Sequence, residues 1–165
     1  MRRSVLLFLG LFAAAACTSH DPAAELDVKV METYWVLDSP ARETQYMAPA
    51  VRISVRNKSP EKLRSIQATA NFRRVGEEET WGSAWEQVTD ASKPLEPGQE
   101  MVVVLRSEGR YTSTGGAEAM FTHEQFKDAR AELFLRVGSS PWTKMAEAPV
   151  ERRVGSKTVE KLGTP

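Results

Sequence analysis

The chain has 165 residues, with 22 basic and 22 acidic side chains and a formal net charge of zero at pH 7. A nucleic-acid-binding surface needs a strong basic excess on one face, so this balance argues against nucleic acid as a partner. The single cysteine excludes an internal disulfide, and the length suffices for one domain with a hydrophobic core.

Residues 1–16 are predicted to be a secretory signal peptide. Arg2 and Arg3 precede an apolar run from Val5 to Ala16. As a helix this run would span about 18 Å, well short of a bilayer hydrocarbon core of about 30 Å. Basic residues, a short apolar segment and small residues before a cut site are typical of an export signal rather than of a permanent membrane span.

The only cysteine, Cys17, directly follows three alanines, 14–16. This pattern resembles the lipobox of bacterial lipoproteins, which implies cleavage before Cys17, a diacylglycerol on its thiol and often an acyl chain on its amine, with palmitate among the expected acyl groups. Two or more acyl chains hold a protein stably on a membrane. Thr18 follows instead of aspartate, which implies the periplasmic face of the outer membrane in an organism with two membranes. The alternative is an ordinary signal cut that leaves Cys17 a free thiol.

Residues 17–25 are predicted to be the lipidated cysteine and a small, polar tether, with a reach of roughly 26 Å beyond the cysteine. From Leu26 onward apolar residues recur with period two, and residues 34–37 form a second apolar stretch. Strict alternation over residues 51–55 and 66–72 predicts half-buried strands of an antiparallel sheet.

Further strands are predicted along the rest of the chain. Residues 85–89 suggest a short edge strand, and the run 101–105 is continuous enough to be buried on both faces or strongly twisted. The remaining predicted strands are residues 131–137, 142–145 and 150–154.

One stretch, residues 107–128, breaks the alternation and is rich in glycine, serine and threonine. Thr122 with Gln125 fits a helix capping box, which predicts a short helix over residues 123–128. Residues 155–165 have no periodicity and are predicted to be a flexible tail.

Two segments share features with a known domain family. An opening strand from Val51, a turn centred on Asn57 and a second strand ending in Phe72 precede the bend at Gly76. Residues 95–99, Leu-Glu-Pro-Gly-Gln, come before the valine-rich run. These features resemble the FxLYD-type immunoglobulin-like domains of exported bacterial lipoproteins, a family with no common catalytic residue. The expected fold is therefore all-β: an antiparallel immunoglobulin-like β-sandwich over residues 26–154, with one short helix in a loop.

The sequence offers little material for catalysis. Its two histidines, His20 and His123, lie in the tether and at the predicted helix start. No serine lies in a Gly-x-Ser-x-Gly turn, no spacing of ligand residues matches a metal site, and no glycine-rich phosphate loop opens a helix. We therefore expect no catalytic residue, no metal and no cofactor beyond the lipid, and a protein that is not an enzyme.

Two aromatic groups are candidate binding surfaces. Trp81 and Trp85 would share a face on one strand and could stack on a sugar or anchor a protein partner; the alternative is packing across the open side of the sandwich. The loop with Arg110 and Tyr111, which leads to Phe121, could carry recognition, because long loops on rigid sandwiches often do. The alternative for this loop is a lid over one end of the core.

The sequence thus predicts a non-enzymatic, membrane-anchored lipoprotein that contacts another component of the cell envelope, with an envelope protein as the expected partner. A small-ligand or carbohydrate-binding module on the same scaffold is the alternative. An accessory lipoprotein of a secretion or envelope assembly is a third hypothesis.

Overall fold

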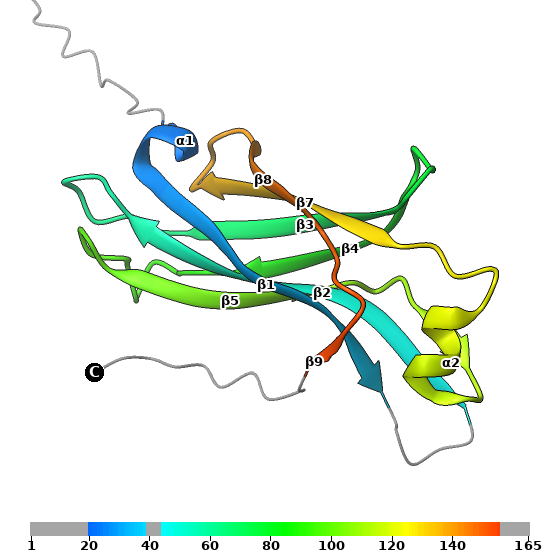
Figure 1. Cartoon of the computed structure of the whole chain (residues 1–165). Coiled ribbons are helices and arrows are strands. Elements are labelled where there is room, and N and C mark those ends of the chain that lie inside the picture. The colour runs from blue at the N-terminus through cyan, green and yellow to red at the C-terminus, as the bar shows by residue number, and fades with distance from the viewer. Residues whose placement is uncertain (1–19, 39–43, 156–165) are drawn as a thin grey trace, which may run out of the picture.

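The computed structural model describes residues 20–38 and 44–155. The predicted signal peptide, Cys17 and residues 156–165 of the predicted tail lie outside this part. Two β-sheets pack face to face, and a short helix, α2, lies at one end of them (Figure 1). This confirms the predicted all-β sandwich with one short helix in a loop.

The described elements follow one another in the order shown in Figure 1. They are α1 (Pro22–Glu25), β1 (Leu26–Asp38), β2 (Gln45–Asn57), β3 (Ile66–Arg74), β4 (Thr80–Gln87), β5 (Glu100–Arg106), β6 (Tyr111–Ser113), α2 (Gly116–Thr122), β7 (Ala129–Val137), β8 (Thr143–Pro149) and β9 (Val154–Gly155).

The first sheet has the strand order β5-β2-β1-β9, with β6 pairing to the beginning of β2, and the second has the order β4-β3-β7-β8. The strand pairs are antiparallel, apart from the short parallel contact between β1 and β9. After β3 and β4 in the second sheet, the chain returns to the first sheet, where β5 lies beside β2. This crossing connection is the Greek-key arrangement of immunoglobulin-like sandwiches.

The strands with the clearest alternation line the core as predicted. Their apolar positions face the other sheet and are almost completely buried, while the polar residues between them face outward. These core positions are Val51, Ile53 and Val55 on β2, Ile66, Ala68, Ala70 and Phe72 on β3, and Ala131, Leu133, Leu135 and Val137 on β7.

A bulge in β1 explains why its apolar pattern changes along the strand. The register against β2 shifts between Val30 and Glu32, which leaves Met31 as the extra residue with 53% of its surface exposed. An extra residue exchanges the two faces of a strand. Leu26 therefore points into the core before the bulge, and Trp35 points into it afterwards, with none of its surface exposed.

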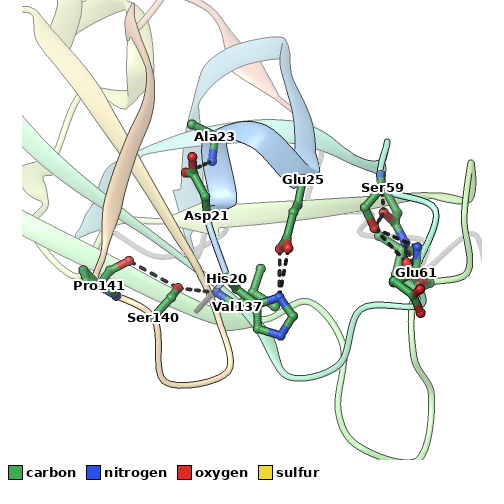
Figure 2. Close-up of polar contacts among 11 residues, drawn as sticks. His20, Asp21, Ala23, Glu25, Ser59, Glu61, Val137, Ser140 and Pro141 are labelled. Atoms are coloured by element: carbon green, nitrogen blue, oxygen red, sulfur yellow. Dashed lines mark hydrogen bonds and ion pairs between the residues drawn. The ribbon is translucent and has the colours of Figure 1, made fainter. Parts of the chain in front are cut away.

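The chain enters the sandwich through α1, so residues 22–25 of the predicted tether are helical. Asp21 caps the helix by accepting a hydrogen bond from the backbone N–H of Ala23, and Pro22 occupies the first turn. Figure 2 shows this end of the molecule, where Nδ1 of His20 lies 3.0 Å from the Glu25 carboxylate.

The predicted turn at Asn57 is built around a fully buried side chain. Its amide donates to the carbonyls of Glu61 and Leu95 at 2.7 and 2.9 Å, and its oxygen accepts from the N–H of Ser59. These bonds hold the β2–β3 loop, part of which appears in Figure 2, against the loop before β5.

Three predicted elements differ in the structure. Of the strand expected over residues 150–154 only Val154 is in a strand, and it forms the two-residue β9 with Gly155, which was expected to begin the tail. The helix expected over residues 123–128 is wrong: α2 precedes it and ends at Thr122, whose hydroxyl donates to the carbonyl of Glu118 instead of capping a following helix. The run 101–105 lies on an edge strand rather than a strand buried on both faces, and Val102 is 38% exposed.

The C-terminal strap, residues 150–155, crosses from the second sheet to the first (Figure 1). The N–H of Val150 donates to the carbonyl of Ala129 on β7, and the N–H of Trp35 on β1 donates to the carbonyl of Arg153. Gly155 lies against the ring of Tyr34, where a Cβ atom would stand 2.1 Å from a ring carbon. The strap therefore buries Tyr34 on the outer side of β1.

Candidate functional site

The two tryptophans predicted to share a strand face are separated by a β-bulge. Phe72 on β3 pairs with Gly82, whereas Arg73 pairs with Thr80, so Trp81 is the extra residue on β4. A bulge redirects the side chain that it carries. Trp81 packs against the core, while Trp85 lies on the outer face and is 55% exposed. The predicted shared face is therefore wrong.

Trp81 belongs to an aromatic cluster at the end of the sandwich that holds α2. Trp35 lies at its centre, within 6.3 Å of the other four rings, measured between ring centroids. The aromatic cluster consists of Trp35, Trp81, Tyr111, Phe121 and Phe126. Its members come from β1, β4, β6, α2 and the segment before β7, so it joins five parts of the chain.

The predicted recognition loop packs against this end of the core. Tyr111 and Phe121 are partly buried in the aromatic cluster, and the Tyr111 hydroxyl donates to the carbonyl of Lys127. The guanidinium of Arg110 stacks over the ring of Tyr46, 4.2 Å from its centroid. Of the predicted surface residues, the structure thus brings Trp81, Tyr111 and Phe121 together in the aromatic cluster. Arg110 lies beside Tyr46 of β2, and Trp85 lies apart from them on the outer face of the second sheet.

Trp85 lies on the outer face of the second sheet, in a group that we call the tryptophan face. It pairs with Thr69, which on its other side pairs with Phe134. Neighbouring strands are about 4.8 Å apart, so the backbones of Trp85 and Phe134 stand about 10 Å apart across Thr69. The tryptophan face consists of Trp85, Thr69, Phe134, Arg136 and Trp142.

The other end of the tryptophan face is formed by a stacked pair. The Arg136 guanidinium lies 4.7 Å from the ring centroid of Trp142, which is 38% exposed. The Nε of Arg136 also donates a hydrogen bond to the side-chain oxygen of Gln67 at 2.8 Å. Sequence reasoning missed Phe134 and Trp142. The sequence feature that could have indicated this face was Phe134, because an aromatic residue there takes an outward position between Glu132 and Arg136.

A ladder of alternating charges borders the tryptophan face. Glu132 contacts Arg73 at 3.1 Å and Lys144 at 2.8 Å, and Glu147 contacts Lys144 at 2.7 Å and Arg130 at 3.3 Å. The hydrogen bond from Lys144 lowers the pKa of Glu147 below its ordinary value. Because these charges are paired on the sheet itself, the face is polar at its border without being strongly charged.

The two histidines make separate local contacts. His20 contacts Glu25 near α1, whereas Nδ1 of His123 accepts from the backbone N–H of Gln125 after α2. Within residues 20–38 and 44–155, no group of three or more histidine, cysteine or acidic residues is placed to hold a metal ion. In that same part of the chain, no helix has the length and hydropathy needed to cross a membrane.

No protein-family model matches the chain, and no curated protein sequence matches it significantly. Several solved structures are similar in shape at low sequence identity. The alignment with a structural genomics target solved by X-ray diffraction covers 88% of this chain and 97% of the target, with 9% identity and a TM-score of 0.42. The putative ApaA protein from Bordetella pertussis covers 81% and 96%, with 14% identity and a TM-score of 0.41.

A third similar structure is the ligand-binding region of serine-glutamate repeat protein A of Enterococcus faecium. It covers 74% of this chain and 88% of its own, with 13% identity and a TM-score of 0.33. At these values, none of the three similarities indicates what this chain binds.

Proposed function

We propose that the chain is a non-enzymatic lipoprotein, anchored through Cys17, which uses the tryptophan face to contact an envelope protein. The anchor rests on the sequence before Cys17. A short tether is supported by the sequence separation, since only Thr18 to Asp21 stand between the cysteine and the first residue of α1. The sandwich is then held beside the lipid surface, where its outer faces meet neighbouring envelope components.

The observation that carries the proposal is the exposure of Trp85. More than half of this large side chain is open to solvent on a strand whose inward positions are packed. Exposed tryptophan and arginine side chains are enriched among the residues that dominate protein–protein binding energy. Trp85, Phe134 and the Arg136–Trp142 stack lie on one face of the sheet. The charge ladder along its border supplies part of the polar rim that such interfaces carry.

A glycan is the second candidate ligand, favoured by one observation. The Arg136 guanidinium is held between the Trp142 ring and Gln67, so planar polar groups lie beside exposed rings. This combination suits the stacking and hydrogen bonding of a sugar ring. A thermal-shift screen with envelope glycans separates this case, since a Trp85→Ala variant would then lose the shift.

The protein contact is tested by placing a photo-crosslinking amino acid at position 85 of the full chain in intact cells. We expect a discrete product in the envelope fraction that disappears when Cys17 is changed to serine, because the released chain no longer resides at the membrane. The matched control is the same crosslinker at Met31, which is 53% exposed on a strand of the first sheet.

Identical products from positions 85 and 31, or none from position 85, would contradict a contact through the tryptophan face. Retention of the Cys17→Ser chain in the membrane fraction would contradict the lipid anchor independently. The two parts of the proposal therefore fail separately.

A further inference from the structure

Strand β5 is an edge of the first sheet that lacks the features by which other edges avoid pairing. Exposed edges are usually blocked by bulges, prolines, short length or inward-pointing charges. On the second sheet, β4 carries the bulge at Trp81 and places Glu86 opposite the buried Ala68. The other edge, β8, has a register shift against β7 and ends at Pro149.

The seven residues of β5 contain no proline and no bulge, and no charge lies between its two end residues. Its inward side chains Met101 and Val103 are only partly buried, because no strand of the described chain lies beyond them. Val102, on the outer side, is 38% exposed. The edge is therefore open and apolar along its length.

The backbone hydrogen bonds show which groups of β5 face this open edge. At the two ends of the strand, the N–H of Ser107 donates to Pro49 and the N–H of Asn57 donates to the carbonyl of Gln99. Bonding alternates along an antiparallel strand, so the odd-numbered residues bond to β2. The N–H and C=O groups of residues 100, 102, 104 and 106 point away from β2.

The sequence of β5, Glu-Met-Val-Val-Val-Leu-Arg, is symmetrical in character about Val103. An acid begins it, a base ends it, and similar apolar residues stand at equal distances from its centre. A two-fold axis brings each residue of an interface to its counterpart on the other copy, so a strand pairs well with itself only if it is self-complementary. We infer that β5 pairs antiparallel with β5 of a second copy of this chain, with Val103 on the two-fold axis.

This register satisfies each requirement of an antiparallel ladder. Val102 faces Val104 of the other copy as a hydrogen-bonded pair, and Met101 faces Leu105. Glu100 faces Arg106, whose guanidinium already contacts Asp38 and has further N–H donors available.

The pairing joins the first sheets of two molecules into one continuous sheet and leaves the tryptophan face on the second sheet free. The open edge is bounded after Arg106, where the N–H of Glu108 donates to the carbonyl of Ser83 and the chain crosses to the second sheet. The self-pairing is thus independent of the proposed envelope contact.

The test uses the full chain extracted from membranes in detergent, with analytical ultracentrifugation as the measure of self-association. Val102→Lys and Val104→Glu each place an unpaired charge opposite a valine, and we expect each to raise the dimer dissociation constant about tenfold or more. In the double variant, each lysine faces a glutamate, and the dissociation constant should return to within about threefold of the unmodified chain. Val75→Lys, at an exposed valine away from this edge, is the control and should leave it unchanged.

A second measurement tests the register directly. A cysteine at position 103 faces its own copy in a non-hydrogen-bonded pair with Cα atoms about 4.5 Å apart, which a disulfide can bridge. Val103→Cys should form a covalent dimer on mild oxidation, while Val75→Cys and the unmodified chain, with Cys17 alone, should not.

Three outcomes would overturn the inference. The full chain could remain monomeric at all concentrations, both charged variants could associate as tightly as the unmodified chain, or the double variant could fail to restore association. A chain that becomes dimeric only after residues 156–165 are removed would also overturn it, because this segment would then occupy the edge.

Discussion

At the scale of single residues, the tryptophans show how strongly position decides the role of a side chain. Trp35 is completely buried and contacts four other rings, whereas Trp85 is mostly exposed and pairs across the sheet with Thr69. The indole Nε1 of Trp35 finds no hydrogen-bond acceptor among the described residues. Its stabilising contribution therefore comes from packing.

We expect Trp35→Ala to lower the free energy of unfolding by about 3–5 kcal/mol, because it leaves a large cavity in the aromatic cluster. Trp85→Ala should change it by no more than about 0.5 kcal/mol, because the exposed side chain fills no core space. Urea unfolding followed by circular dichroism measures both variants. A large loss of unfolding free energy in Trp85→Ala would show that Trp85 stabilises the fold, which would contradict its role as a free contact residue.

At the scale of elements, one arginine of the C-terminal strap connects the strap to the end of the sandwich that holds the aromatic cluster, called here the aromatic end. Arg152 contacts both carboxylate oxygens of Asp128 at 2.6 and 2.8 Å, stacks over Phe126 and donates to the carbonyl of Phe121 at 3.3 Å. These contacts connect the strap to α2 and to the segment before β7. The hydrogen bonds from Arg152 hold the pKa of Asp128 below its ordinary value.

The stabilisation by this pair should depend on pH in a defined direction. Because the folded-state pKa of Asp128 is lowered, its contribution is fully present above the unfolded-state pKa of about 3.9 and is lost as the pH falls through the folded-state value. The stability difference between the unmodified chain and Asp128→Asn should be constant above about pH 5 and shrink below about pH 4. Thermal unfolding at a series of pH values measures it, with Glu96→Gln, at an exposed carboxylate outside the aromatic cluster, as the control. A difference that grows on acidification would contradict this sign.

The strands that could be predicted from the sequence are those whose alternation of apolar and polar residues is uninterrupted, such as residues 51–55 and 66–72. The bulges at Met31 and Trp81 could not be predicted, because one extra residue leaves no composition signal and yet exchanges the two faces of a strand. The edge position of β5 depends on sheet order, which a local apolar run does not reveal. The predicted shared face of Trp81 and Trp85 was wrong for the same reason: it was inferred from their spacing along the strand, and the bulge at Trp81 changes which face that residue occupies.

At the scale of the whole molecule, the C-terminal strap makes the two sheets depend on each other. The hydroxyl of Thr33 on β1 donates to the carbonyl of Pro149 at the end of β8 and accepts from the N–H of Glu151. Arg153 contacts both Glu32 and Glu151 and lies over the ring of Tyr34. The strap thus covers the outer side of β1 and connects the two sheets.

A chain that ends after Pro149 should be less stable than one that ends after Gly155 by about 3 kcal/mol, because it exposes the Tyr34 and Val36 side chains. The second truncation is the matched control, since it keeps the strap and removes only the residues beyond it. Chemical denaturation compares the two chains directly. Equal stabilities would show that the strap lies on the sandwich without supporting it.

The burial of Trp35 also gives the molecule a built-in optical reporter. An indole without contact to water emits at shorter wavelength and is shielded from soluble quenchers, whereas the exposed ring of Trp85 emits at longer wavelength and is quenched readily. Fluorescence can therefore follow the aromatic end and the outer face of the second sheet separately within one sample. Occupation of the outer face and opening of the aromatic end would shift the spectrum in opposite directions, so the native chain can distinguish them without an added label.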